Sequence, residues 1–304
     1  MNKKTVKSYA KINLALNVLG KTNGYHNLDT VVCTVNKYDL ITVTKRKDKK
    51  ILVTFVGPYA TQCDRQEDTN AYKAAKLFID TFLTNGANIE VNRLIPTGSG
   101  MGGSSADIVG VLYALKKVYD VDKPLKPLAD SLGSDTGYLL NGGFARLTGR
   151  GDIVELIPSN IKLYFVVIYA KSGVNTKECF ELFDNLDSND VEKSNIKEVV
   201  KGIQNEDFTH FKGNVVNGLQ SVAIKLNEEI ATNLEVLKSW SPSYLSMSGS
   251  GSTVFALYEN LEMAKWAYEK LKYKYDERVE LLTSYDPKKP YFIDALLGRN
   301  IIEE

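Results

Sequence analysis

Ten residues near the middle of the chain, PTGSGMGGSS at positions 96–105, include four glycines and three serines. Glycine loses more backbone entropy on folding than other residues, so such a cluster indicates positive φ angles or a close approach to the main chain. A flexible surface loop would also tolerate this composition. Apolar residues then recur at helical spacing, at Ile108, Val111, Leu112, Leu115 and Val118. The pattern predicts a loop that leads into a helix capped by Ser104 or Ser105.

The charge balance argues against a large charged partner. The chain of 304 residues has 38 Lys and Arg against 37 Asp and Glu, a net charge of +1. Without a basic excess, we expect no binding to nucleic acid or to an anionic membrane, and small polar ligands must be held at a local site. The longest apolar runs are too short to span a bilayer, and the first residues lack the apolar core of a signal peptide. We therefore expect a cytoplasmic protein.

Cysteine usage adds no structural chemistry. The three cysteines are widely spaced and form no C-x-x-C pair: Cys33, Cys63 and Cys179. Neither a disulfide framework nor a zinc site is predicted.

The order of predicted elements indicates an α+β protein. Strand-like segments dominate the first hundred residues, at 11–19, 30–35, 40–44, 51–56 and 87–95, with a helix at 71–84. The second half predicts a buried strand at 163–170, a polar surface excursion at 184–197, helices at 211–226, 228–240 and 261–273, and a glycine turn before a strand within 244–258. A boundary between two lobes is expected near residues 155–162.

We compared the glycine run with three kinds of phosphate-binding loop, and two of them do not match it. Gly98, Gly100 and Gly103 satisfy the G-x-G-x-x-G pattern of dinucleotide-binding folds, but residues 89–94 alternate instead of forming a doubly buried strand, and Pro96 ends them. A Walker A loop would need a lysine after the glycines. The remaining possibility is a cradle in which backbone N–H groups and a helix N-terminus bind an anion, helped by the serine hydroxyls.

The same stretch, continued to PTGSGMGGSSAD, resembles the phosphate-binding motif of the GHMP kinases, roughly P-x-x-x-G-L-G-S-S-A. The resemblance implies that ATP is bound with Mg²⁺ and that Ser104 or Ser105 lies near the metal. The implied nucleotide-binding residues are Pro96, Thr97, Gly98, Ser99, Gly100, Met101, Gly102, Gly103, Ser104 and Ser105.

Further motifs point to one branch of this family. SYAKINL at positions 8–14 and GYHNLDT at positions 24–30 are similar to the opening of the kinases that phosphorylate 4-diphosphocytidyl-2-C-methyl-D-erythritol. Residues 132–137, LGSDTG, match the branch motif G-[SA]-D-x-P with Gly137 in place of proline. This resemblance implies catalytic roles for Asp135, as the base that accepts the hydroxyl proton, and for Lys11, as its partner.

The acceptor-binding residues follow from the same resemblance. The segment VNTKECF at 174–180 is similar to one that carries a threonine and an aromatic against the cytosine, and residues 142–155 and 247–252 match further glycine-rich motifs. The implied substrate contacts are Asn13, Tyr25, His26, Thr176 and Phe180, with the cytosine between Tyr25 and Phe180. The motifs follow in order from about residue 9 to residue 273.

The resemblance also implies an architecture. We expect a two-lobed α+β fold with the active site between a ribosomal-protein-like N-terminal lobe (1–157) and a ferredoxin-like C-terminal lobe (158–285), followed by a tail (286–304). The predicted reaction is transfer of phosphate from ATP to the 2-hydroxyl of a cytidine diphosphate-linked polyol, in isoprenoid precursor synthesis. A homodimer is a further expectation.

Other functions stay open at this point. Related kinases acting on mevalonate, phosphomevalonate or homoserine share the loop but do not need the GYH segment or Phe180. Mevalonate diphosphate decarboxylase shares the fold and a catalytic aspartate. Because the glycine loop has only Gly102 and Gly103 directly before its serine pair, a non-catalytic binding protein of the same fold is another alternative.

Overall fold

The computed structural model describes residues 2–60, 63–187 and 191–284, and the expected tail lies outside them. The first lobe is built on a six-stranded sheet in which β1 pairs with β2 and the others follow the order β3-β4-β2-β5-β6. Its strands are β1 (Lys3–Thr22), β2 (Tyr25–Lys45), β3 (Ile51–Val56), β4 (Ala87–Asn92), β5 (Phe144–Gly149) and β6 (Ile153–Leu156). Neighbours are antiparallel except for β3 and β4, which are parallel.

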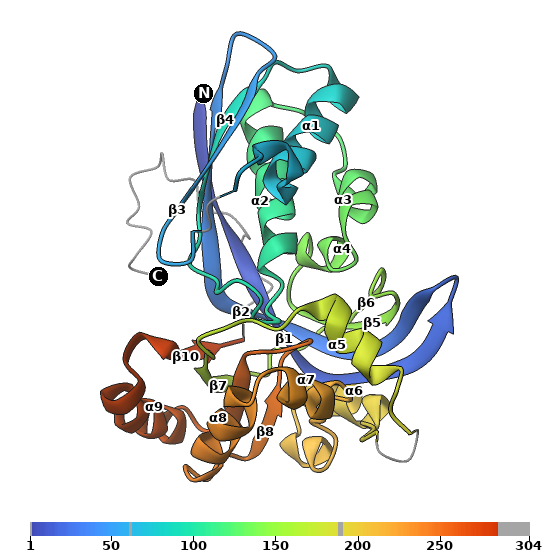
Figure 1. Ribbon diagram of the computed structural model, residues 1–304, viewed down its shortest axis with the longest axis vertical. Coiled ribbons are helices and arrows are strands. Elements are labelled where there is room, and N and C mark those ends of the chain that lie inside the picture. Colours follow the sequence, from blue (N-terminus) through green and yellow to red (C-terminus); the bar gives the residue numbers. More distant parts are fainter. Residues whose placement is uncertain (1, 61–62, 188–190, 285–304) are drawn as a thin grey trace.

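Helices cover one side of this sheet (Figure 1). They are α1 (Asn70–Phe82), α2 (Gly103–Tyr119), α3 (Lys126–Leu132) and α4 (Thr136–Leu139), with a 3₁₀ turn at Gln66–Asp68. Helix α2 is the central one, because its apolar residues pack together with strand residues such as Ile41 and Ile89 and with Phe78 of α1 in one buried cluster. Burying this face of α2 fixes the position of its N-terminus, where the glycine loop arrives.

The second lobe has an antiparallel four-stranded sheet in the order β10-β7-β9-β8. Its strands are β7 (Tyr164–Ile168), β8 (Tyr244–Met247), β9 (Val254–Tyr258) and β10 (Val279–Thr283). Its helices are α5 (Thr176–Phe183), α6 (Ile196–Asn205), α7 (Gln220–Leu226), α8 (Glu229–Lys238) and α9 (Leu261–Tyr275), with 3₁₀ turns at Phe208–Phe211 and Asp276–Arg278. The predicted α+β class is confirmed.

The second sheet is buried on both faces. Along β7, Val166 and Ile168 share a cluster with buried residues of α8 and α9. Phe165 and Val167 point the other way and share a cluster with Ile12 of β1 and with other strand residues of the first lobe. This period-two division explains why residues 163–170 read as a continuous apolar run.

A long hairpin joins the lobes. Strand β1 has 20 residues and β2 has 21, and together they extend past the second lobe to a tip at residues 22–25 (Figure 1). The segments predicted separately at 30–35 and 40–44 are parts of the single strand β2. The polar residues between them suggested a break, but Tyr38 packs edge-on against Tyr9, with ring centroids 5.5 Å apart, and Asp39 is buried.

Two predictions about helices were wrong. Residues 211–226 do not form one helix, because α7 begins only at Gln220, after a chain reversal in which Gly213 has a φ of +72°. The N-cap of α2 is Gly102 with a φ of +77°, whereas Ser104 and Ser105 lie inside the first turn. The strand at 51–56 and the helices at 71–84, 228–240 and 261–273 are confirmed to within two residues at each end. Among the described residues, no helix is long and apolar enough to cross a membrane.

Candidate active site

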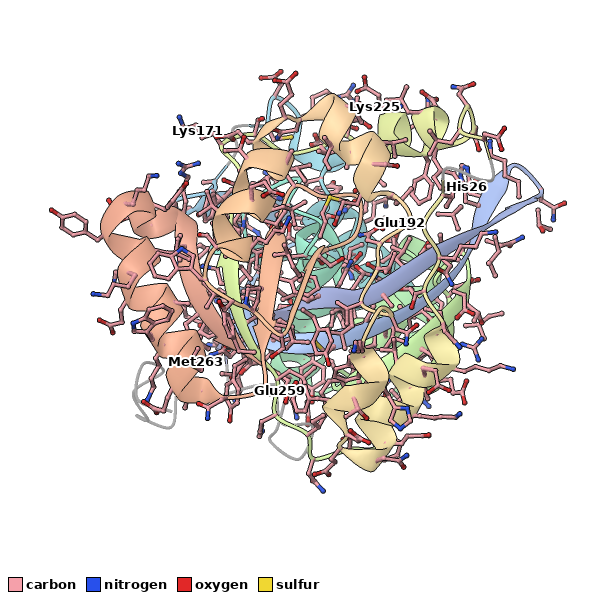
Figure 2. All side chains as sticks on the ribbon, turned by 90° about the horizontal axis from the view of Figure 1, so that it is seen from below. His26, Lys171, Glu192, Lys225, Glu259 and Met263 are labelled. Carbon is pink, nitrogen blue, oxygen red and sulfur yellow. The ribbon has the colours of Figure 1, made fainter. Side chains whose placement is uncertain are left out.

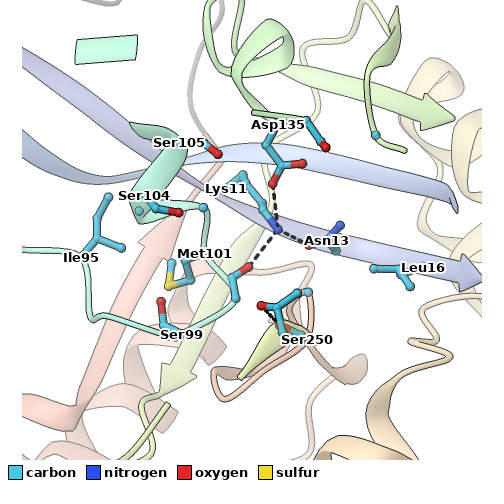
Figure 3. Close-up of a pocket in the computed structure, with 18 of the residues that line it drawn as sticks. Lys11, Asn13, Leu16, Ile95, Ser99, Met101, Ser104, Ser105, Asp135 and Ser250 are labelled. Atoms are coloured by element: carbon cyan, nitrogen blue, oxygen red, sulfur yellow. Dashed lines mark hydrogen bonds and ion pairs between the residues drawn. The ribbon is translucent and has the colours of Figure 1, made fainter. Parts of the chain in front are cut away.

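A cavity of about 500 Å³ lies where the glycine loop, the long hairpin and the second lobe meet (Figure 3). It is lined by all ten residues at 96–105, by Lys11 and Asn13 of β1, by Asp135, and by Thr176 and Phe180 of α5. The structure therefore brings together most of the residues singled out in the sequence. Tyr25 and His26 are not among the lining residues.

Lys11 is at the centre of this cavity. Its Nζ donates to Asn13 Oδ1 at 2.5 Å and to the carbonyl oxygen of Gly100 at 2.9 Å, and it lies 3.7 Å from Asp135 Oδ2. The residue is only 6% exposed. Burial lowers the pKa of the Lys11 ammonium, and the nearby Asp135 carboxylate counteracts that effect. Lys11 and Asp135 are thus close enough to form the expected ion pair.

The glycine loop turns its carbonyl oxygens toward the protein. The Gly98 oxygen accepts from the backbone N–H groups of Val174 and Ser252, both at 3.2 Å, and the Met101 oxygen accepts from Lys11 N–H at 3.0 Å. Within the part of the chain that the structure describes, the backbone N–H groups of residues 100–105 donate no hydrogen bond to a backbone carbonyl oxygen. Together with the α2 N-terminus, these donors form a cradle for an anion.

Glycine is required in this loop for two reasons. Gly98, Gly100 and Gly102 have φ angles of +65°, +74° and +77°. At Gly100, an added Cβ would lie 2.0 Å from the carbonyl oxygen of Ser248, in the glycine turn of the second lobe. The loop and that turn are therefore packed backbone to backbone, which only glycine allows. The glycines are therefore needed both for their positive φ angles and for the close contact with the second lobe.

Asp135 stands at the start of the short helix α4, with its side chain 30% exposed to the cavity. The β5–β6 turn lies against it, since a Cβ on Gly151 would be 3.5 Å from Asp135 Oδ1. Gly137, where the family branch has proline, packs beside the side chain of Asp130. A Cβ there would lie 2.6 Å from Asp130 Oδ1, so a larger residue would displace the Asp130 side chain.

On the cavity wall formed by α5, Phe180 stacks on His26 with ring centroids 4.6 Å apart and an interplanar angle of 27°. Figure 2 shows His26 near the far end of the hairpin, and its Nε2 lies 2.7 Å from Asp184 Oδ1. Tyr25 is 59% exposed and lies under the guanidinium of Arg150 instead of facing Phe180. Phe180 therefore forms an aromatic edge to the cavity, with His26 of the hairpin tip packed against it.

Thr176 and the helix that carries it are fixed locally. Asn175 caps α5 by accepting from the N–H groups of Lys177 and Glu178 at 3.0 and 3.3 Å. The Thr176 hydroxyl lies 2.9 Å from the Ser250 hydroxyl, which belongs to the glycine turn of the second lobe. These contacts place a polar group on the cavity wall.

A buried cluster of charged residues under the loop, Asp39, Arg93 and Asp107, was not predicted from the sequence. Asp39 accepts from the N–H groups of Leu94 and Ile95 at 2.6 and 2.8 Å, just before the loop begins. Arg93 donates to Asp107 Oδ2 at 2.8 Å. Asp39 and Arg93 both line the cavity. The one sequence feature that could have indicated this cluster is Asp39, an acidic residue next to the apolar strand residues of YDLITV at 38–43.

The site offers few ligands for a metal ion. Over residues 2–60, 63–187 and 191–284, no group of three or more His, Cys, Asp and Glu side chains is placed to hold one. The oxygens that Mg²⁺ prefers are present as the hydroxyls of Ser104 and Ser105 and the carboxylate of Asp135. This donor set fits an ion bound mainly by the phosphate groups of a ligand.

Family models for two domains match the chain. The GHMP kinase N-terminal domain model matches residues 69–145, and the GHMP kinase C-terminal model matches residues 191–277. This chain belongs to the GHMP kinase family. The N-terminal match includes the glycine loop and Asp135.

Individual relatives of this GHMP kinase agree with the family assignment. A 4-diphosphocytidyl-2-C-methyl-D-erythritol kinase from Clostridium beijerinckii is 33% identical over 90% of this chain and 97% of its own length. A solved structure of a 4-(cytidine 5'-diphospho)-2C-methyl-D-erythritol kinase matches with a TM-score of 0.76 and 24% identity, over 93% of this chain and all of the other. A homoserine kinase structure from Cytophaga hutchinsonii matches with a TM-score of 0.75 and 18% identity, over 94% and 95% of the two chains.

The buried cluster under the loop predicts how stability depends on pH. Burial, with a smaller effect from Asp107, raises the pKa of Asp39 to about 7, and burial raises the pKa of Asp107 to about 6. An unfolded aspartate titrates near pH 3.9, so between about pH 4 and pH 7 the folded protein binds more protons than the unfolded chain. These two groups therefore stabilise the fold most at low pH, and their contribution is lost as the pH rises through 7.

We expect Asp39→Asn to weaken this dependence, because an amide can still accept from Leu94 N–H and Ile95 N–H without being desolvated as a charge. Urea unfolding at pH 5 and pH 8 measures the effect. The free energy of unfolding should fall less between the two pH values in the variant than in the parent. The exposed Asp122→Asn is the control. Equal pH dependence in Asp39→Asn and the parent would contradict the assignment.

Proposed function

We propose that this GHMP kinase transfers the γ-phosphoryl group of ATP to the 2-hydroxyl of 4-diphosphocytidyl-2-C-methyl-D-erythritol. The observation that carries the proposal is the buried Lys11 ammonium, which lies between the Asp135 carboxylate and the glycine loop. Relatives named for this reaction, including the one at 33% identity over 90% of the chain, favour this acceptor.

The donor is held by the cradle at residues 98–105. The triphosphate would accept from the free N–H groups of the loop and lie against the N-terminus of α2. Mg²⁺, when bound, neutralises charge on the phosphate groups, and Ser104 and Ser105 would hold it with the triphosphate. Phosphoryl transfer needs little covalent chemistry from the protein, so the loop acts by positioning and by electrostatic stabilisation.

Asp135 and Lys11 act on the acceptor. Asp135 would accept the proton of the attacking hydroxyl, since its side chain lines the cavity and is partly exposed. Lys11 Nζ lies 3.7 Å from this carboxylate and would hold it in position for the acceptor hydroxyl. Asn13 accepts from Lys11 and donates to Thr30, so it holds the ammonium in place while lining the acceptor side.

The aromatic edge favours an acceptor that carries a planar base. Phe180 lines the cavity and stacks on His26, and an aromatic ring at the cavity wall can contact a planar base such as cytosine. Kinases for mevalonate or homoserine have no such base to bind. The fold does not decide between these acceptors, because the homoserine kinase structure matches about as well, at a TM-score of 0.75 against 0.76.

Asp135→Asn tests the proposed base. General base catalysis typically contributes roughly 10²–10⁴-fold, so we expect a loss of kcat of that size with nearly unchanged ATP binding. ATP consumption would be measured with cytidyl-methylerythritol, mevalonate, phosphomevalonate and homoserine. Asp130→Asn, which removes a carboxylate paired with Lys126 outside the cavity, is the control. Turnover within about threefold of the parent would remove Asp135 from the mechanism.

Gly102→Val tests the cradle. A β-branched residue at a φ of +77° is strained, and its side chain would enter the space beside Lys11, where an added Cβ already lies 3.2 Å from Lys11 Cγ. We expect weaker ATP binding by calorimetry. Gly213→Val imposes a similar strain at a φ of +72° in open space far from the loop, so it controls for strain alone. If both variants bind ATP like the parent, the loop is not the nucleotide site.

Phe180→Ala tests the acceptor side. Losing a stacked base costs on the order of 1–3 kcal/mol in single-strand binders, so KM for the cytidyl substrate should rise roughly ten-fold while KM for ATP stays unchanged. Phe183→Ala is the matched control. Phe183 is also on α5 and packs against the same apolar core cluster as Phe180, but it does not line the cavity. An equal effect of both substitutions, or melting-temperature losses that parallel the KM change, would assign Phe180 to the core instead.

A further inference from the structure

One cation at the cavity wall has no strong partner in the part of the chain that the structure describes. Three cationic side chains line the cavity there: Lys11, Arg93 and Arg150. Lys11 is paired with Asp135, and Arg93 is paired with Asp107 at 2.8 Å. Arg150 has only Asp152, with 3.8 Å between Nη2 and Oδ2, and its side chain is 50% exposed. Its charge is therefore available to a ligand.

The backbone holds Arg150 in a fixed turn between β5 and β6. Gly149 and Gly151 on either side have φ angles of +66° and +96°, and the Arg150 N–H donates to Asp152 Oδ1 at 2.8 Å. The guanidinium lies over the ring of Tyr25, 4.9 Å from its centroid. A guanidinium stacked on a ring keeps its N–H groups free in the plane for hydrogen bonds. The Tyr25 ring therefore positions the Arg150 guanidinium and leaves its N–H groups available to a ligand.

The position of Arg150 relates two parts of the site. Tyr25 adjoins His26, whose ring stacks on Phe180 at the aromatic edge, and Gly151 lies against Asp135. In a cytidyl diphosphate-linked polyol, the diphosphate lies between the base and the hydroxyl that reacts. A substrate with its base at the aromatic edge and its hydroxyl at Asp135 must pass its diphosphate beside the β5–β6 turn.

We propose that Arg150 binds the diphosphate of the acceptor substrate and so selects nucleotide-linked polyols over small free alcohols. The inference rests on the proposed function, because it assumes that the acceptor carries a nucleoside diphosphate. The guanidinium matches phosphate oxygens in a two-point contact that lysine cannot reproduce. Arg150 is a specificity residue in this scheme and takes no part in the proton transfer.

The experiment measures binding without turnover. Cytidine and cytidine 5'-diphosphate are titrated by calorimetry into the parent, Arg150→Ala, Arg150→Lys and Arg46→Ala. Arg46 is the matched control, since it also has an aspartate two residues further on, Asp48, and does not line the cavity. The parent should bind the diphosphate more tightly than cytidine, and Arg150→Ala should reduce this advantage roughly ten-fold, as expected for one charge-assisted contact.

Further readouts separate the outcomes. Cytidine and ATP affinities should be unchanged in Arg150→Ala, Arg150→Lys should keep part of the advantage, and added salt should erode it in the parent more than in Arg150→Ala. An unchanged diphosphate advantage in Arg150→Ala would overturn the proposal, and so would a parallel loss of ATP affinity, which would assign Arg150 to the donor. If cytidine and its diphosphate both fail to bind the parent, the proposed function itself fails.

Discussion

The site is organised around one buried charge, the ammonium of Lys11. Removing an ammonium from water is costly unless oxygens replace its hydration, and here the oxygens come from three separate segments: Asn13 on β1, Gly100 in the glycine loop and Asp135 before α4. The Lys11 main chain adds a hydrogen bond to Met101. One side chain therefore connects the central sheet, the glycine loop and the proposed base.

The second lobe completes this arrangement from the other side. The Ser248 hydroxyl donates to the same Gly100 oxygen that accepts from Lys11, at 3.1 Å, and the Asn13 N–H donates to that hydroxyl at 3.2 Å. The glycine loop is thus bonded to both lobes, while the N–H groups of residues 100–105 have no backbone acceptor among the described residues. Such preorganisation lets the donors stabilise charge without rearrangement during the reaction.

Local signals predicted much of this structure, and tertiary contacts decided the rest. Segments such as β3 and α9 were predicted to within two residues, and most of the site residues that the ordered motifs implied line the cavity, although Tyr25 and His26 do not. The continuity of β2 through Asp39 could not be predicted, since it depends on hydrogen bonds from Leu94 and Ile95, which are distant in sequence. The same holds for α7, where the Asn217 side chain bonds to the carbonyl oxygens of Met247 and Gly249 instead of continuing a helix.

The long hairpin has an evolutionary consequence. Its strands belong to the first lobe in sequence, but Asn17 exchanges two hydrogen bonds with Ser194 of the second lobe, both at 2.9 Å, and Asp184 accepts from Lys21 and pairs with His26. A recombinant that joined the first half of one family member to the second half of another would divide these partners between two parents. The hairpin tip, α5 and the segment after it therefore have to change together if these contacts are to be kept. Exchange of whole lobes would break these contacts, whereas single substitutions in this region leave most of them in place.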